Sequence, residues 1–248
     1  MVSEAGGPRR MLVIGAHSAD FVWRAGGALA VTTTTTGGVG RVIALSYGEK
    51  GESGELWKDS DPAHPQTIDN VKKIRHGEAE RAAGHLGADF RCLDLGDYPL
   101  QIDGEALERI SDEIREFAPD VLITHTDTDP FNPDHPVANE AVGRARSLAA
   151  GAGVQSSFKT VKPPEFFLFE PHQPELCNFT PTTFVDITAV MDAKRAAMAE
   201  MKAQKYLHTY YAERAGHRGN HARRSSGNQD IRQAEAFQRV TPQVVSSL

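Results

Sequence analysis

Short apolar segments alternate with longer amphipathic segments along most of this chain. The apolar segments have the length and composition of strands buried in a sheet, and they are residues 11–14, 41–46, 90–94, 120–125, 166–169 and 184–187. Helical patterns lie between and after them, at residues 21–31, 69–86, 104–117, 137–150 and 189–205. The alternation predicts an α/β fold of Rossmann-like form, with a mostly parallel sheet and helices on both faces. We expect a single domain over residues 1–248, with residues 1–9 as a flexible N-terminus.

Composition adds a cellular setting to this picture. The 248 residues are 40% hydrophobic, which suits one substantial core. Two cysteines are too few for a disulfide scaffold, and no apolar run is long enough to span a membrane. With 33 acidic and 27 basic residues, the chain is unsuited to nucleic acid. We therefore expect a cytoplasmic protein without a membrane or nucleic-acid partner.

Histidine and aspartate gather where two of the expected strands end. His17 and Asp20 follow the strand at 11–14, and His135 follows the strand at 120–125. Carboxyl ends of parallel strands are where α/β folds place their ligands. Two histidines and one carboxylate with an open position form a recurrent catalytic zinc set, which iron, manganese or cobalt can also occupy. The alternative is that each histidine is an ordinary loop residue, since convergence cannot be seen in a sequence.

These motifs resemble the LmbE-like (PIG-L) superfamily of zinc-dependent de-N-acetylases. The superfamily motifs Ala-His-Pro-Asp-Asp and His-Pro-Asp-His correspond here to Ala16-His-Ser-Ala-Asp20 and Asn132-Pro-Asp-His135. The resemblance extends over roughly residues 10 to 240, through segments such as Arg75-His-Gly-Glu78 and Val185-Asp-Ile-Thr188. It implies that His17, Asp20 and His135 bind one Zn²⁺ per subunit.

Two departures from the superfamily pattern bear on the reaction. Ala19 stands where the deacetylases carry their general-base aspartate, and Asn132 stands where they carry a histidine that supports the oxyanion. General-base assistance contributes about 10² to 10⁴ in rate, so losing it while keeping the ligands argues for a different reaction at the same metal. Asn132 remains a candidate substrate contact.

One branch of the superfamily is similar in these same departures. The run Ala16-His-Ser-Ala-Asp-Phe-Val-Trp-Arg24, together with Ser46-Tyr-Gly-Glu49 and Asp94-Leu-Gly-Asp-Tyr-Pro-Leu100, resembles the 4-oxalomesaconate hydratases of gallate and protocatechuate breakdown. The resemblance implies a hydro-lyase that converts 4-oxalomesaconate to 4-carboxy-4-hydroxy-2-oxoadipate. A zinc-dependent de-N-acetylase of an N-acetylglucosaminyl conjugate is the alternative. A third interpretation is a non-catalytic protein, either a metal-stabilised scaffold or a ligand-binding protein.

Hydration needs a group that moves protons in place of Ala19. Glu49, at the end of the second strand, is the first candidate, because neighbouring parallel strands share one crevice. His172 is the second candidate. Either could instead be a solvated loop residue. Glu49 opens a Gly-, Pro- and Ser-rich segment, residues 48–67, which we interpret as a long functional loop in which Trp57 packs the loop down or caps the substrate.

A tricarboxylate substrate also needs cations. Residues 214–229 carry four arginines and no acid, and arginine suits bidentate carboxylate binding. The candidate substrate-binding arginines are Arg24, Arg75, Arg214, Arg218 and Arg223. Arg75 could equally form a helical pair with Glu78. The basic segment could also be an oligomer contact or plain surface, and we expect a homo-oligomer.

Overall fold

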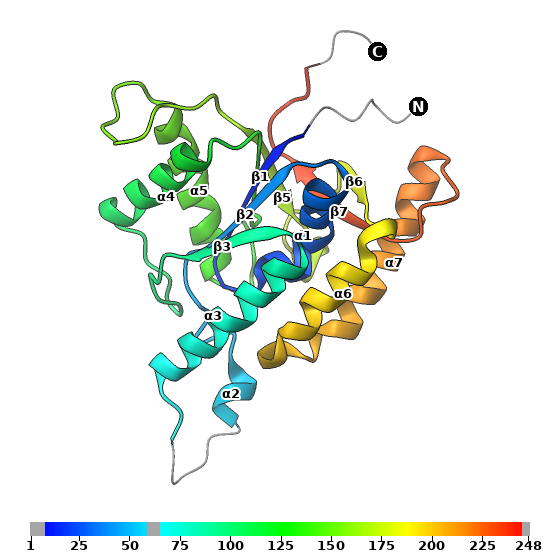
Figure 1. The fold of residues 1–248 in the computed structure, drawn as a ribbon, viewed down its shortest axis with the longest axis horizontal. Coiled ribbons are helices and arrows are strands. Elements are labelled where there is room, and N and C mark those ends of the chain that lie inside the picture. Colours follow the sequence, from blue (N-terminus) through cyan, green and yellow to red (C-terminus); the bar gives the residue numbers. More distant parts are fainter. Residues whose placement is uncertain (1–7, 59–64, 245–248) are drawn as a thin grey trace.

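A seven-stranded sheet forms the centre of the molecule (Figure 1). The computed structural model describes residues 8–58 and 65–244. Its strands are β1 (Arg10–Gly15), β2 (Val39–Ala44), β3 (Ala88–Cys92), β4 (Val121–Thr124), β5 (Glu165–Phe169), β6 (Thr183–Asp186) and β7 (Ala234–Arg239). They lie in the order β3-β2-β1-β4-β5-β7-β6.

The strand order creates one switch point and one reversal. From β1 the chain adds β2 and β3 on one side and then returns to place β4 on the other side of β1. The crevice at such a reversal of order is where open α/β sheets bind ligands. Within the described chain, β7 is the strand that runs antiparallel, and it pairs with both β5 and β6.

Helices cover both faces of the sheet (Figure 1). They are α1 (Asp20–Ala30), α2 (Gly54–Lys58), α3 (Ile68–His85), α4 (Gly104–Phe117), α5 (Asp134–Ala150), α6 (Met191–Glu200) and α7 (Leu207–Ser226). A π-helical turn at Val31–Thr35 extends α1. Short 3₁₀ turns lie at Pro174–Leu176, Thr188–Val190 and Lys202–Gln204.

Alternating side chains of the strands feed two hydrophobic cores. On β1, Val13 joins a core with α1, α3, α6 and α7, whereas Leu12 and Ile14 join a second core with α4 and α5. Burial on both faces explains why the central strands are continuous apolar runs. The central strands are therefore packed on both faces by helices.

The predicted α/β fold is confirmed, with differences in the C-terminal third. All six expected strands are present, and the four helices expected before residue 150 are present within three residues of their expected bounds. The helix expected at 189–205 is instead α6 between two 3₁₀ turns, and α7 and β7 were not expected as elements. Of the expected flexible N-terminus, residues 1–7 lie outside the described residues.

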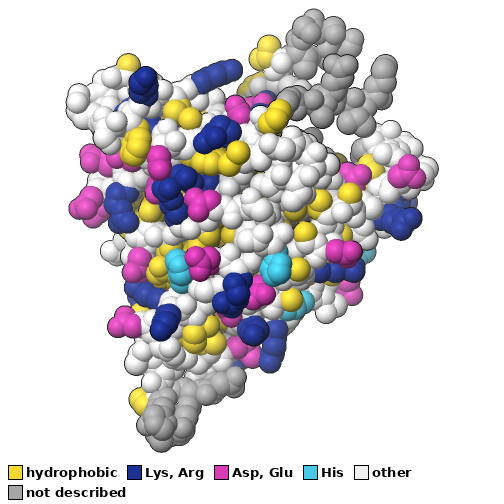
Figure 2. Space-filling model, viewed as in Figure 1, with side chains coloured by type: hydrophobic (Ala, Val, Ile, Leu, Met, Phe, Trp, Pro, Cys, Tyr) yellow, Lys and Arg dark blue, Asp and Glu magenta, His cyan; other side chains and the backbone are white. Residues whose placement is uncertain are grey.

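The surface carries charges of both signs. On the face seen in Figure 2, acidic and basic side chains are interspersed around α3 and α6. In the ranges 8–58 and 65–244, no helix is long and apolar enough to cross a membrane.

Candidate functional site

The three residues proposed as metal ligands converge at the switch point of the sheet. His17 lies in the turn after β1, Asp20 begins α1, and His135 lies in the first turn of α5 after β4. The backbone N–H of His17 donates to Asp20 Oδ2 at 2.7 Å, which closes the turn around the carboxylate. Because β1 and β4 are neighbours, two short loops far apart in sequence meet here.

The donor atoms of these residues face one another in a buried space. His17 Nδ1 lies 3.6 Å from Asp20 Oδ2, and His135 Nε2 lies 3.7 Å from Asp20 Oδ1. One ligand atom from each residue lies within 4.8 Å of the others. His17 Nδ1 and His135 Nε2 are buried and have no hydrogen-bond partner among the described residues. Buried polar atoms normally have partners, so this pair fits a metal cation.

Each of the two histidines has a further carboxylate next to its other ring nitrogen. Asp134 Oδ2 lies 3.2 Å from His17 Nε2, and Asp129 Oδ2 lies 2.7 Å from His135 Nδ1. Asp134 in turn accepts the backbone N–H groups of Tyr98 and Leu100. Carboxylates in this position orient metal-binding imidazoles and leave the opposite nitrogen for the ion.

The carboxylates give the site a negative potential. Burial alone would lower the pKa of His17, but Asp134 and Asp20 outweigh it and raise that pKa to about 10. Burial and the neighbouring His125 hold the pKa of His135 well below its usual value. The site thus favours positive charge at His17 Nδ1 while leaving a neutral lone pair on His135, which again suits a cation.

A cavity of about 260 Å³ opens beside this cluster. Its wall is formed by the first turns of α1 and α5, by loops at the carboxyl ends of the strands, and by the 3₁₀ turn before α7 and the first residue of α7. The lining residues are Asp20, Trp23, Arg24, Glu52, Tyr98, Asp129, Phe131, Asn132, His135, His172, Gln173, Gln204, Tyr206 and Leu207. Of the predicted site residues outside the ligand set, Arg24, Asn132 and His172 line this cavity, whereas Glu49 does not.

Glu52 is a further carboxylate that lines the cavity, and it was not among the predicted site residues. Its Oε1 accepts the Asn132 Nδ2 amide at 2.7 Å and lies 4.0 Å from His17 Nδ1. Its Oε2 accepts Gln204 Nε2 at 2.5 Å. Gln204 is itself oriented, because its Oε1 accepts from Trp23 and Arg75. The sequence signal that could have indicated Glu52 is its position three residues after Glu49 in the same loop.

The Glu49 side chain does not line the cavity. This corrects the expectation that Glu49 shares one crevice with the residues at the neighbouring strand ends. Its side chain is buried, with Oε1 3.7 Å from Lys72 Nζ, and burial raises its pKa. Gly48, at φ +70°, lies directly before Glu49. Trp57 donates to the Glu49 carbonyl at 2.7 Å and so packs the loop down, as one of its two readings proposed. The segment 59–64 of the expected loop lies outside the described residues.

Among the candidate arginines, Arg24 is the one that faces the cavity. Its Nη1 donates to Asp20 Oδ1 at 2.5 Å, and its buried Nε has no partner among the described residues. Arg75 is wholly buried and donates to Glu78 Oε2 at 3.0 Å, so the scaffold alternative describes it better than substrate binding does. Arg75 also donates to Gln204 Oε1, the amide that in turn donates to Glu52.

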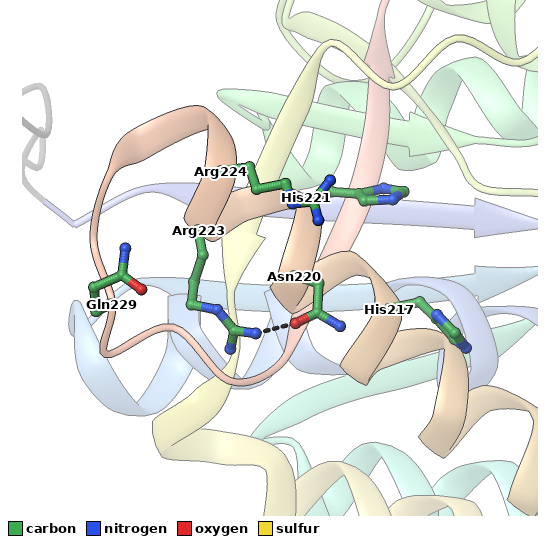
Figure 3. Close-up of a pocket in the computed structure, with 6 residues that line it drawn as sticks. All are labelled: His217, Asn220, His221, Arg223, Arg224 and Gln229. Atoms are coloured by element: carbon green, nitrogen blue, oxygen red, sulfur yellow. Dashed lines mark hydrogen bonds between the residues drawn. The ribbon is translucent and has the colours of Figure 1, made fainter.

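The basic segment 214–229 does not form a substrate wall. Most of it is helical, and Arg214 and Arg218 both donate to the buried carboxylate of Glu170. Arg223 donates to the Ile231 carbonyl and to Asn220, on the outer side of α7. There it lines a surface pocket with His217, Asn220, His221, Arg224 and Gln229 (Figure 3). The substrate-binding assignments of Arg214, Arg218 and Arg223 are therefore not supported by their positions.

His172 enters the cavity from the loop after β5. Its ring stacks on Tyr210 with the centroids 4.2 Å apart, and its Nδ1 lies 3.3 Å from the Tyr211 hydroxyl. Burial and the charges of Arg24 and Arg214 lower its pKa to about 4. The imidazole is thus neutral near pH 7.

Fold and site together define an α/β protein with a candidate metal site of two histidines and one carboxylate at the switch point of its sheet. Residues 12–146 match the PIG-L family, described as GlcNAc-PI de-N-acetylase. The chain belongs to this family.

Its relatives include hydratases. A Pseudomonas putida KT2440 protein named 4-oxalmesaconate hydratase is 42% identical over 96% of this chain and 91% of its own length. The crystal structure of GalB, the 4-carboxy-2-hydroxymuconate hydratase from the same strain, superposes with a TM-score of 0.92, covering 97% of this chain and 99% of that one at 42% identity. N,N'-diacetylchitobiose deacetylase from Pyrococcus horikoshii, at 18% identity, a TM-score of 0.72 and 93% and 83% coverage, shares the fold.

Proposed function

We propose that this protein is a zinc-dependent hydratase that adds water to the carbon-carbon double bond of 4-oxalomesaconate and yields 4-carboxy-4-hydroxy-2-oxoadipate. The observation that carries the proposal is the 42% identity, along nearly the whole of both chains, to the protein named 4-oxalmesaconate hydratase. The site supplies the groups that such a reaction needs.

Three buried residues would hold the metal. His17, Asp20 and His135 present their donor atoms to one another, and the two imidazole nitrogens lack other partners in the described chain. Zn²⁺ is proposed because two histidines and a carboxylate are a common zinc set. When bound, the ion would supply Lewis acidity, which lowers the pKa of water and polarises oxygens of the substrate.

Glu52 is the group proposed to accept the proton of the attacking water. The Asn132 and Gln204 amides each donate to one of its oxygens, which fixes the orientation of the carboxylate. Each oxygen keeps a further lone pair for water, because a carboxylate accepts about four hydrogen bonds. Glu52 therefore takes over the task that Ala19 cannot perform.

Amide hydrolysis is disfavoured by the same geometry. Ala19 is buried between two of the ligands and offers no base, and Asn132 is engaged with Glu52. Neither residue can support the tetrahedral oxyanion as a cationic histidine would. The described site thus lacks the deacetylase groups at both positions that the family motif supplies.

Arg24 is the proposed contact for a carboxylate of the substrate. Its guanidinium lines the cavity, and its Nε is unpartnered in the described chain. Arginine binds carboxylates through paired N–H groups. A small tricarboxylate is therefore the substrate class that we propose.

The deciding experiment is loss of the absorbance of 4-oxalomesaconate in the presence of purified zinc-loaded protein. We expect turnover that disappears after chelation and returns with added Zn²⁺, with the hydrated product identified by mass spectrometry. A parallel assay measures acetate released from N-acetylglucosaminyl substrates. Metal-dependent acetate release without hydration would replace this proposal with the deacetylase alternative.

A further inference from the structure

Residues in one turn of α7 contact His172 at three places. The Tyr210 ring stacks on the imidazole at an interplanar angle of 14°. The Tyr210 hydroxyl and Arg214 Nη2 both donate to the His172 carbonyl oxygen, the latter at 2.9 Å. The Tyr211 hydroxyl lies 3.3 Å from His172 Nδ1. Backbone, ring plane and one ring nitrogen of His172 are therefore all fixed by residues 210–214.

The contact at Nδ1 decides which ring nitrogen carries the proton. Tyr211 is buried, and a buried hydroxyl needs an acceptor for its proton. Within residues 8–58 and 65–244, His172 Nδ1 is its hydrogen-bond partner. If Nδ1 carried the proton instead, the hydroxyl would accept that hydrogen bond and leave its own proton without an acceptor.

Charge around the phenol favours the same orientation. Arg24 and Arg214 both act on Tyr211, and burial raises its pKa to about 12, so the phenol stays protonated. An oxygen facing guanidinium groups turns its lone pairs toward them and its proton away. The imidazole is neutral for the same reason, since both arginines and burial oppose a second proton on it.

We infer that Tyr211 is a positioning residue whose hydroxyl donates to His172 Nδ1, so that neutral His172 presents Nε2–H to the cavity as a hydrogen-bond donor. His172 lines the cavity, and Nε2 is its remaining ring nitrogen. An imidazole in this state cannot accept a proton at Nε2. His172 is therefore a donor and Glu52 the acceptor at the same site.

The inference deepens the proposed hydration and rests on it for its chemical meaning. When water attacks the conjugated double bond, a carbon-oxygen bond forms and the π electrons move onto the carbonyl oxygen of the substrate. A fixed N–H donor near that oxygen stabilises the charge that develops there. We assign this donor to His172 Nε2–H, with the water proton going to Glu52.

The test compares two adjacent tyrosines. Tyr211→Phe removes the hydroxyl at Nδ1 and keeps the ring that stacks on Trp23, whereas Tyr210→Phe removes the hydroxyl at the His172 carbonyl. Zinc-loaded protein with ¹⁵N-labelled histidine is examined by long-range ¹H–¹⁵N correlation at pH 7.5. The His172 signals are assigned by their loss in His172→Gln.

We expect wild type and Tyr210→Phe to show a protonated Nε2 and an unprotonated Nδ1, and Tyr211→Phe to show a mixture of the two tautomers. The kcat of Tyr211→Phe for hydration falls about tenfold or more with KM little changed, as for loss of a contact made mainly in the transition state. The kcat of Tyr210→Phe falls less.

A wild-type spectrum with the proton on Nδ1, or an unchanged tautomer in Tyr211→Phe, overturns the inference. The wild-type spectrum decides the matter by itself if Tyr211→Phe does not fold. The spectra do not depend on the substrate, so a protein that fails to hydrate 4-oxalomesaconate but shows the Nε2–H tautomer refutes the proposed function and leaves the assignment of Tyr211 standing.

Discussion

Two glutamates three positions apart in one loop have side chains that point to different surroundings. Glu49 and Glu52 share one loop, yet Glu49 is directed toward Lys72 and Glu52 toward the metal-ligand cluster. Between them, the N–H groups of Lys50 and Gly51 donate to the buried carboxylate of Asp97. The sequence supplies both carboxylates but does not record which one the anchored loop turns inward.

The two glutamates therefore form a matched pair of variants. We expect Glu52→Gln to lower the kcat for hydration by about 10² to 10⁴, the usual contribution of a proton-transfer group. Glu49→Gln should keep kcat within about threefold, because its carboxylate does not line the cavity. Steady-state kinetics at equal zinc content measure both. The opposite ranking would return the role of base to Glu49.

At the scale of elements, prediction succeeded where burial makes apolar patterns and failed where it does not. The strands and the first four long helices have such patterns. The buried face of α7 consists of Tyr211, Ala215, Gly219 and Ala222, and small residues leave little periodic hydrophobicity. The convergence of His17, Asp20 and His135 was predictable for a related reason, since these residues directly follow strand ends.

The strand β7 was not recognised because a charged residue, Glu235, lies in its buried first half. Glu235 accepts the N–H groups of Gly27 and Ala28 and pairs with Lys194 Nζ at 2.5 Å. A run of alanine and glutamate favours helix by local propensity, so the strand depends on tertiary contacts: the pairing with β5 and β6 and the bonds of Glu235. The orientation of Glu52 and the contacts of α7 with His172 likewise depend on partners distant in sequence.

Small residues on α7 allow a close approach that can be tested with two glycines. A Cβ on Gly219 would lie 2.1 Å from the Arg232 carbonyl oxygen, whereas no described atom lies within 4 Å of a Cβ on Gly216. We expect Gly219→Ala to lower the free energy of unfolding by about 1–3 kcal/mol through overpacking.

The control variant Gly216→Ala should raise the free energy of unfolding by about 0.5–1 kcal/mol, because alanine is the better helix former. Urea unfolding followed by circular dichroism measures both variants. Equal effects at the two positions would contradict the packing of α7 against the segment before β7.

At the scale of the whole molecule, the neutral state of His172 carries a cost in acid. Its pKa is about 4 in the folded protein and near 6.5 in an unfolded chain. Between these values the unfolded state binds more protons, so stability falls as the pH falls. Arg24 and Arg214 oppose protonation of the ring and Asp129 favours it.

His172→Gln removes this contribution. From pH 7 to pH 5, we expect the wild-type free energy of unfolding to decrease by about 1–2 kcal/mol more than that of the variant. Urea titrations at the two pH values, with zinc saturating in each, give the difference. Parallel pH dependence in the two proteins would show that His172 titrates normally.

The placement of β7 between β5 and β6 also constrains the order of assembly during synthesis. Every other strand of the described sheet leaves the ribosome before β7, yet β6 joins the sheet through β7. Until β7 emerges, β5 and β6 expose unpaired edges that can pair with other chains. While α6 and α7 are being translated, the sheet of the nascent protein is therefore incomplete and has unpaired edges that can bind other chains. Insertion of β7 between β5 and β6 pairs these edges.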